Sequence, residues 1–400
     1  MSRSISPPPL KRRKVAVQES AKLNPIRIFS WNISGIDAFL PPPNTQNITA
    51  FFQPKSSTSS GQSTSSSSPL RAFLTRHNNP HVLFLQELKI APRNATDTLA
   101  SLRRALNPPT SDAHRPTYEI HISLPRDKYN ARAFGGKLYG VATILRSDFA
   151  DKHITRVYAP DWDLEGRVLI TETNFPETKS PIEIKPPIQT NFPPEDTLIP
   201  KSHPEPLALI NIYAINGTSA PYYNPDTGKV TGTRHDLKVR YHSLLRDECL
   251  LLEKRGFHVV VAGDVNVARS AWDGFPRLRT VPEIHCVNRR DFNGKFFGRG
   301  DNIRAGVECG EGVGHGSEGV EGGCLDAVDV WRAVFGEERR YTYFPRGREW
   351  GSSCDRVDMV FVSGGLWEAG RVLGTGILDT VQEGGTSDHV PIWVEVGVGG

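Results

Sequence analysis

Apolar and polar residues alternate along the chain in a way that predicts short strands separated by helices. Apolar or alternating runs predict strands at 26–31, 81–85, 118–123, 139–145, 167–173, 207–214, 257–262, 356–363 and 391–396. Apolar positions three and four residues apart predict helices at 70–77, 96–106, 237–254 and 325–335. Because the strands come in twos and threes between helices, the pattern predicts a β-sandwich covered by helices.

Four segments interrupt this periodicity. Residues 1–24 are polar and contain Lys11-Arg12-Arg13-Lys14, so we expect a disordered basic tail. Residues 41–69 are rich in Pro, Ser and Gln, 174–206 in Pro and 293–323 in Gly. We expect these three to be low-complexity surface inserts in one domain that spans 25–397. The basic tetrad resembles a nuclear localisation signal, which predicts a nuclear protein; a solvated charge run is the alternative.

Charge and cysteine content narrow the function classes. The 400 residues carry a net charge of +4, which permits a polyanionic partner without requiring one. The five cysteines are scattered and form no CxxC, so a disulfide framework or a zinc knuckle is not expected. No apolar run approaches the length of a membrane span, and we expect no membrane contact.

The end of one apolar run points to chemistry. Residues 257–262 read as a buried strand that ends at Gly263, and Asp264 and Asn266 follow directly. Positions two apart in a strand share a face, so the carboxylate and the amide project together if the strand geometry continues. A turn after the strand, with Asn266 capping the next element, is the simpler alternative.

Polar residues at the ends of apolar runs recur along the chain. Six strands or strand ends carry polar residues that are able to act in catalysis. They are Asn32, Glu87, Tyr213 with Asn216, Asp264 with Asn266, Asp358, and Asp388 with His389. Acids that converge at one sheet edge repel one another unless a cation or a proton lies among them. The set therefore predicts metal-assisted phosphodiester hydrolysis.

Each residue type suggests a part in that reaction. Asn32, Glu87 and Asp388 offer the hard oxygen ligands that Mg²⁺ or Mn²⁺ prefers. Asp264 could orient or deprotonate a water, and His389, held protonated by Asp358, could stabilise a phosphoryl oxygen. The predicted phosphate and substrate contacts are Tyr213, Asn266, Asn216, Lys89 and Arg167. For Arg167, an ion pair with Glu165 is an equal alternative.

The ordered motifs SWNISG, LQELK, EGRVLI, INIYAING, GDVNVAR, DRVDMVFVS and TSDHVPIW resemble the endonuclease/exonuclease/phosphatase superfamily. Within it, the chain is most similar to the exonuclease III type of apurinic/apyrimidinic (AP) endonuclease. The resemblance implies a deoxyribonuclease I-like, four-layered α/β sandwich of two mixed sheets flanked by helices. It also implies a monomeric, Mg²⁺-dependent enzyme that acts on DNA duplexes with abasic or damaged 3′ ends in base-excision repair.

Three positions depart from the pattern of that family. Ser34 stands where the family usually has Asp or Asn, Ile215 replaces a proline, and Asp355 replaces an aromatic residue before Arg-x-Asp. Asp355 calls an apolar pocket for an abasic sugar into question. The alternatives are therefore a superfamily phosphoesterase acting on RNA or phosphoinositides, and a weakened member that only binds nucleic acid.

Overall fold

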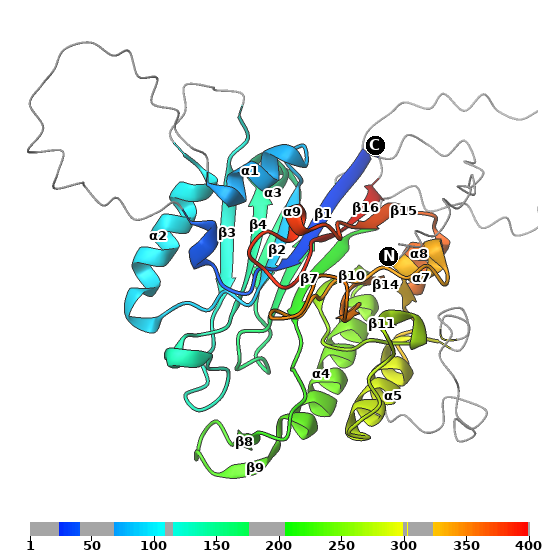
Figure 1. Ribbon diagram of the computed structural model, residues 1–400. Helices are drawn as coiled ribbons and strands as arrows, with labels where there is room; N and C mark the ends of the chain where they lie inside the picture. Colours follow the sequence, from blue (N-terminus) through cyan, green and yellow to red (C-terminus); the bar gives the residue numbers. More distant parts are fainter. Residues whose placement is uncertain are drawn as a thin grey trace, which may run out of the picture.

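Two six-stranded mixed sheets pack face to face, and helices cover both outer faces (Figure 1). This computed structural model describes residues 24–40, 68–108, 115–175, 205–298, 302 and 323–398. The predicted four-layered α/β sandwich is confirmed. The predicted basic tail, apart from Asn24, and most of the three predicted inserts lie outside the described residues.

The first sheet contains the N-terminal and C-terminal strands of the domain. Its order is β15 (Val372–Ile377), β16 (Ile392–Val398), β1 (Asn24–Asn32), β2 (Val82–Gln86), β4 (Val141–Arg146) and β3 (Tyr118–Ser123). Its outer face packs on α1 (Pro69–Arg76) and α2 (Ala95–Leu106). Phe29, Trp31 and Leu83 of the sheet meet Phe73 and Leu102 of these helices there.

The second sheet comes mainly from the middle of the chain. Its order is β12 (Val328–Asp329), β14 (Asp358–Val362), β10 (His258–Asp264), β7 (Leu207–Tyr213), β6 (Val168–Thr173) and β5 (Ile154–Tyr158). Its outer face packs on α4 (Arg234–Lys254) and α5 (Ile284–Phe296). A capping box between Thr233 and Asp236 starts α4, because it satisfies backbone N–H groups that have no partner within the helix.

Short elements connect these layers. They are α3 (Ser147–His153), α7 (Val330–Phe335), α8 (Gly364–Glu368), α9 (Val381–Gly384), and the strand pairs β8 (Pro221–Tyr223) with β9 (Val230–Thr233) and β11 (Gly274–Phe275) with β13 (Cys354–Asp355). No helix in the described ranges is long and apolar enough to span a bilayer.

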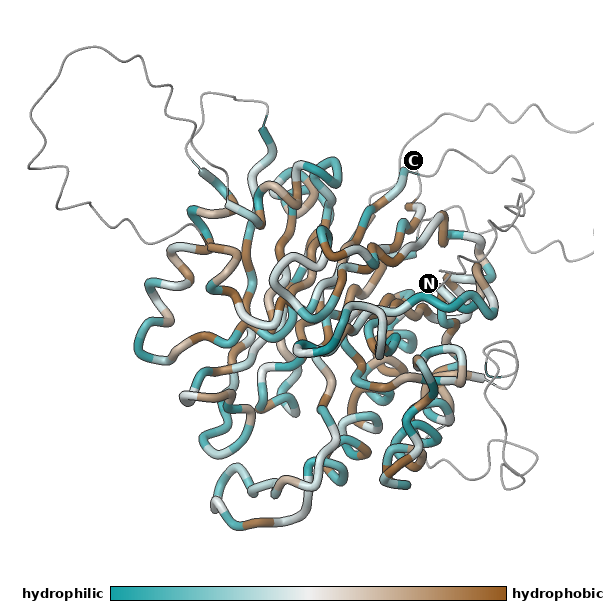
Figure 2. Tube along the Cα trace, viewed as in Figure 1, coloured by the Kyte–Doolittle hydropathy of each residue, from teal (hydrophilic) through white to brown (hydrophobic). Residues whose placement is uncertain are grey.

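The inner faces of the two sheets form the main core. Apolar residues line the strands, whereas polar ones gather on loops and outer helical turns (Figure 2). Asn211 bridges the two sheets across this core, and its Oδ1 accepts from Gln86 Nε2 at 2.8 Å. Asn211 Nδ2 in turn donates to the Ala142 carbonyl at 2.8 Å. This buried bridge fixes the register of the two sheets directly beneath their carboxyl-terminal edge.

Strand direction explains why the polar residues meet. β1 and β2 pair in parallel in one sheet, and β7 and β10 do so in the other, so four strands end at adjoining edges. β14 and β16 run antiparallel to β10 and β1, so they begin at those edges. The residues brought to this place are Asn32, Glu87, Tyr213, Asp264, Asp358, Asp388 and His389.

Several sequence predictions need correction. A helix over 325–335 is wrong in its first half, because β12 precedes α7 there. The stretch 293–323 is not an excursion at its start, because α5 continues through Phe296. Apolar periodicity did not predict this helix, because its residues are largely polar. Asn24 already belongs to β1 and Ser68 caps α1, so the predicted tail and first insert are slightly too long. Phe175 is buried, so it belongs to the core and not to a surface loop.

Candidate active site

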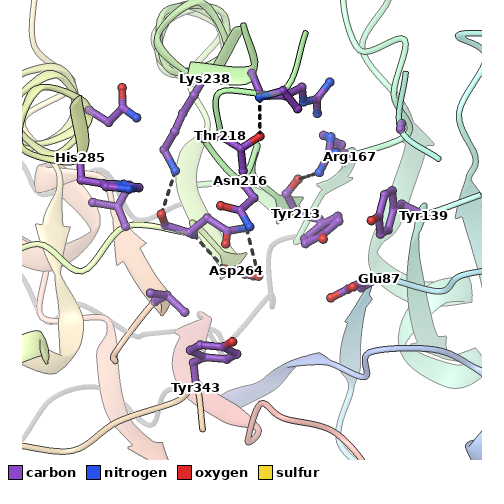
Figure 3. Close-up of a pocket in the computed structure, with 18 of the residues that line it drawn as sticks. Glu87, Tyr139, Arg167, Tyr213, Asn216, Thr218, Lys238, Asp264, His285 and Tyr343 are labelled. Atoms are coloured by element: carbon purple, nitrogen blue, oxygen red, sulfur yellow. Dashed lines mark hydrogen bonds between the residues drawn. The ribbon is translucent and has the colours of Figure 1, made fainter. Parts of the chain in front are cut away.

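A cavity of about 600 Å³ opens where the edges of the two sheets meet. Glu87, Tyr139 and Arg167 line one side, and His285 and Lys238 line the other (Figure 3). The predicted residues that also line it are Tyr213, Asn216, Asp264, Asn266, Asp388 and His389. Two predicted residues, Asn32 and Asp358, lie beneath it, fully or nearly fully buried.

His389 and Asp358 form a buried pair at the floor of this cavity. His389 Nδ1 lies 2.7 Å from Asp358 Oδ2. Burial lowers the pKa of His389, but the Asp358 carboxylate outweighs it and the pKa is raised to about 10. The imidazole is therefore protonated at neutral pH. The contact holds the ring of His389 in one orientation.

Asp264 has the properties of a general base. Its Oδ2 accepts from Asn32 Nδ2 at 3.0 Å, and its Oδ1 accepts from the Asn266 backbone N–H at 2.8 Å. Burial, and then repulsion from Asp358, raises the pKa of Asp264 to about 7. A fixed carboxylate with a pKa near neutrality can accept a proton from water.

Strained backbone presents two of these side chains. Glu87 and Asn266 have left-handed φ angles of 61° and 53°, which residues other than glycine rarely adopt. Asn266 Nδ2 donates to the Ala214 carbonyl at 3.0 Å, which ties the turn after β10 to the end of β7. Such strain persists only where the surroundings enforce it, and it is concentrated at functional sites.

The residues predicted to bind substrate differ in their exposure and in the contacts they make. Asn216 is exposed and lines the cavity. Burial raises the pKa of Tyr213 well above its usual value, so its hydroxyl stays a hydrogen-bond donor. Arg167 lines the cavity but makes the alternative ion pair, with its Nε 2.7 Å from Glu165 Oε2. Its guanidinium also lies 4.7 Å from the ring of Tyr213, so it positions that ring.

Two of the three predicted metal ligands line the cavity, and the third is hydrogen-bonded to other residues. Glu87 and Asp388 line the cavity, and Asp388 Oδ1 is a buried oxygen with no hydrogen-bond partner among the described residues. These hard oxygens fit a divalent cation. Asn32 instead directs its amide nitrogen at Asp264, while its oxygen accepts from the Ser34 N–H at 3.0 Å.

Lys89 lies beside this predicted metal site. Its ammonium nitrogen is 2.7 Å from Glu87 Oε1 and 3.3 Å from Ser34 Oγ. A cation bound at Glu87 would therefore compete with Lys89, and Ser34 contacts the lysine where the family usually supplies an acid or amide.

Asp264, Asp358 and His389 also converge closely enough to hold a metal, with one atom of each within 4.8 Å of the others. We assign these three residues to proton transfer and not to metal binding. His389 Nδ1 is already bonded to Asp358, and the protonated ring has no lone pair to give to a metal.

The sequence did not identify the basic wall of the cavity. Lys238 is buried, and its ammonium donates to the Ile215 and Asn266 carbonyls at 2.9 and 2.8 Å. A lysine at a core-facing position of an amphipathic helix was the available signal. Arg279 and Arg289 reach the site from the turn before α5 and from α5 itself, and only tertiary packing brings them near Asp355.

A buried ion network lies behind this wall. Arg356 pairs with Asp273 and Asp329, each at 2.7 Å, Arg332 also pairs with Asp273, and Arg269 pairs with Asp329. All five side chains are almost fully buried. Because Arg356 lies between Asp355 of β13 and Asp358 of β14, the network anchors the connection between these two strands.

The comparisons with known proteins agree with this geometry. The sequence model of the Endonuclease/Exonuclease/phosphatase family matches residues 29–389, most of the chain. The chain belongs to this family. Members of the Endonuclease/Exonuclease/phosphatase family are hydrolytic and generally depend on a divalent metal. At that level the protein is a phosphoesterase or nuclease. No curated protein matches the chain.

Solved structures match the chain at low identity. The catalytic domain of APE2 from Xenopus laevis is 17% identical with a TM-score of 0.53, and the match covers 94% of each chain. The 3′ phosphatase NExo from Neisseria, bound to a product DNA hairpin, is 17% identical with a TM-score of 0.49, covering 93% of this chain and 99% of that one. An AP endonuclease from Archaeoglobus fulgidus is 14% identical with a TM-score of 0.48, covering 92% and 98%.

Proposed function

We propose that this family member is a Mg²⁺-dependent phosphodiester hydrolase that acts on DNA, as an AP endonuclease or 3′-phosphodiesterase of base-excision repair. One observation carries the proposal: the His389 imidazole, the Asp264 carboxylate and the oxygens of Glu87 and Asp388 meet at one cavity. The motif resemblance to exonuclease III-type enzymes supports DNA as the substrate.

The residues divide the reaction between them. Asp264 accepts a proton from the attacking water, and Asn266 holds that carboxylate in place. His389 donates a hydrogen bond to a phosphoryl oxygen as negative charge builds on it, while Asp358 keeps the ring charged and oriented. The Tyr213 hydroxyl donates to the same phosphate. A cation held by Glu87 and Asp388 would add charge neutralisation at the phosphoryl oxygens.

An incision assay tests this proposal. The full chain is incubated with a DNA duplex that contains one abasic site and with its intact counterpart, in Mg²⁺, Mn²⁺ or EDTA. We expect metal-dependent cleavage that favours the abasic strand, because a nucleotide without a base costs less to extrude. Hydrolysis of RNA or inositol phosphates alone would refute the DNA assignment. DNA binding without hydrolysis in either metal would favour the weakened, binding-only alternative.

Location and assembly complete the proposal. The basic tetrad at residues 11–14 supports a nuclear location, and we propose a monomer. A fluorescent fusion of the chain should enter the nucleus, and one with the tetrad changed to alanine should not. Light scattering should give the mass of a single chain, 44.3 kDa.

A further inference from the structure

The loop between β3 and β4, part of which lines the cavity, carries an unusual aromatic residue. Phe134 is 100% exposed at the tip of this loop, although phenylalanine is normally among the most buried residue types. Tyr129 is also exposed, and Tyr129 and Arg132 line the cavity. Phe134 belongs to none of the apolar core clusters among the described residues, so core packing does not account for it.

Hydrogen bonds at its base, along its length and at its tip hold this loop in one conformation. Ile90 and Leu138 exchange two backbone hydrogen bonds of 2.8 Å at its base. Asn130 donates to the Tyr223 carbonyl at 2.8 Å and accepts from its N–H at 3.1 Å, which ties the loop to β8. The Ala133 N–H donates to the Lys137 carbonyl at 2.8 Å and closes the tip.

Two glycines shape that tip. Gly135 and Gly136 have φ angles of 72° and 73°, a left-handed conformation that favours glycine. They turn the chain sharply, so that Phe134 projects outward.

The exposed face of the loop is cationic as well as aromatic. The segment 126–137 contains four basic residues and one acid. The acid, Asp127, is buried, and its carboxylate accepts from the Tyr129 and Asn130 backbone N–H groups and from Asn130 Nδ2. Arg126, Lys128 and Arg132, on the segment that leads to Phe134, are exposed. Aromatic faces among cations are the chemistry that binds unpaired nucleotides, because bases stack while phosphates pair with the cations.

We propose that Phe134 is a stacking platform for an unpaired nucleobase of the substrate, next to the cavity that holds the reacting phosphate. This inference rests on the proposed action on DNA and specifies it further. The enzyme should engage a single-stranded or frayed segment beyond the scissile bond, rather than a fully paired duplex alone.

Binding measurements on the full chain test this platform. Fluorescein-labelled oligonucleotides, single-stranded or fully paired and blunt, are titrated with protein in EDTA, and anisotropy gives the Kd. Phe134→Ala should weaken single-strand binding by roughly five- to a hundredfold, the range found for loss of one stacked base. Phe134→Trp should retain the affinity, and blunt duplex binding should change little.

A matched control is Leu251→Ala. Leu251 is 52% exposed on α4, about 20 Å along the helix from Lys238 at 1.5 Å per residue. It should leave every Kd unchanged, which separates stacking from a general loss of exposed apolar surface.

The outcomes separate this inference from the proposed function. If the unchanged protein cleaves DNA but Phe134→Ala binds single strands as tightly as it does, the stacking platform is refuted and the proposed function stands. Equal weakening on blunt duplex also refutes it, since the contact would not need an unpaired base. If the unchanged protein neither binds nor cleaves nucleic acid, the proposed function itself fails.

Discussion

Asp264 and Asp358 lie directly opposite each other across the antiparallel pair β10 and β14. Like charges at such positions repel, and both side chains are buried. His389 is hydrogen-bonded to Asp358, and its positive charge partly offsets the repulsion at Asp264. Burial, and then Asp358, raises the pKa of Asp264, and Asp358 raises the pKa of His389 against the effect of burial.

The pH profile should report this arrangement. Activity should rise as pH passes through about 7, where Asp264 loses its proton, and fall near about 10, where His389 loses its own. Asp358→Asn should move the alkaline limb to lower pH, because it removes the carboxylate that raises the pKa of His389 against the effect of burial. Rates of oligonucleotide cleavage between pH 5 and 11 give the profile. An unchanged alkaline limb in the variant would argue against the pairing.

Asp264→Asn and His389→Ala should each lower kcat by roughly two orders of magnitude or more, a usual scale for a positioned base or charge stabiliser. The double variant should lose less than the product of the two, because both groups act on one phosphoryl transfer. Single-turnover rates measure this. Fully multiplicative losses would indicate separate sites.

Glu87→Gln should weaken divalent-cation binding and abolish most activity without unfolding the domain, because Glu87 lines the cavity at a strand end. Calorimetric titration with Mn²⁺ reads out binding independently of turnover. Glu172→Gln is the control, since Glu172 pairs with Arg255 and does not line the cavity. Normal Mn²⁺ affinity in Glu87→Gln would exclude Glu87 as a ligand.

Asp355→Trp should increase cleavage beside an abasic site relative to intact DNA. Burial raises the pKa of Asp355 to about 6, so at neutral pH it places a carboxylate at the cavity wall, where it opposes a phosphate backbone. Arg279 and Arg289 partly balance that charge. The ratio of kcat/KM on abasic and intact duplexes is the measurement. A lower ratio would show that the carboxylate itself assists recognition.

Arg356→Met should destabilise the domain, but by less than the about 3–5 kcal/mol that an unpaired buried charge costs, because Asp273 and Asp329 lose their shared partner and keep Arg332 and Arg269. Lys137→Met removes the exposed ion pair with Asp37 and should cost about 0–1 kcal/mol. Urea unfolding of both variants gives the difference. Equal midpoints would mean that the network contributes little.

The sequence by itself determined the strands that are continuously apolar and the residues that end them. A run such as 257–262 has few alternatives to a buried strand, and Asp264 and Asn266 follow it by covalent connection. The same reasoning located Glu87, Tyr213 and His389, because each follows or precedes an apolar run. The motif order then indicated the sandwich.

Tertiary structure alone decided what those residues touch. The opposition of Asp264 and Asp358 depends on the register of β10 and β14, which no local pattern encodes. The approach of Arg279 and Arg289 to Asp355 depends on segments that are far apart in the chain, whereas Arg167 and Lys89 pair with Glu165 and Glu87 only two residues away. Likewise, a phenylalanine reads as core in any sequence, and only the closed turn at Gly135 and Gly136 leaves Phe134 in solvent.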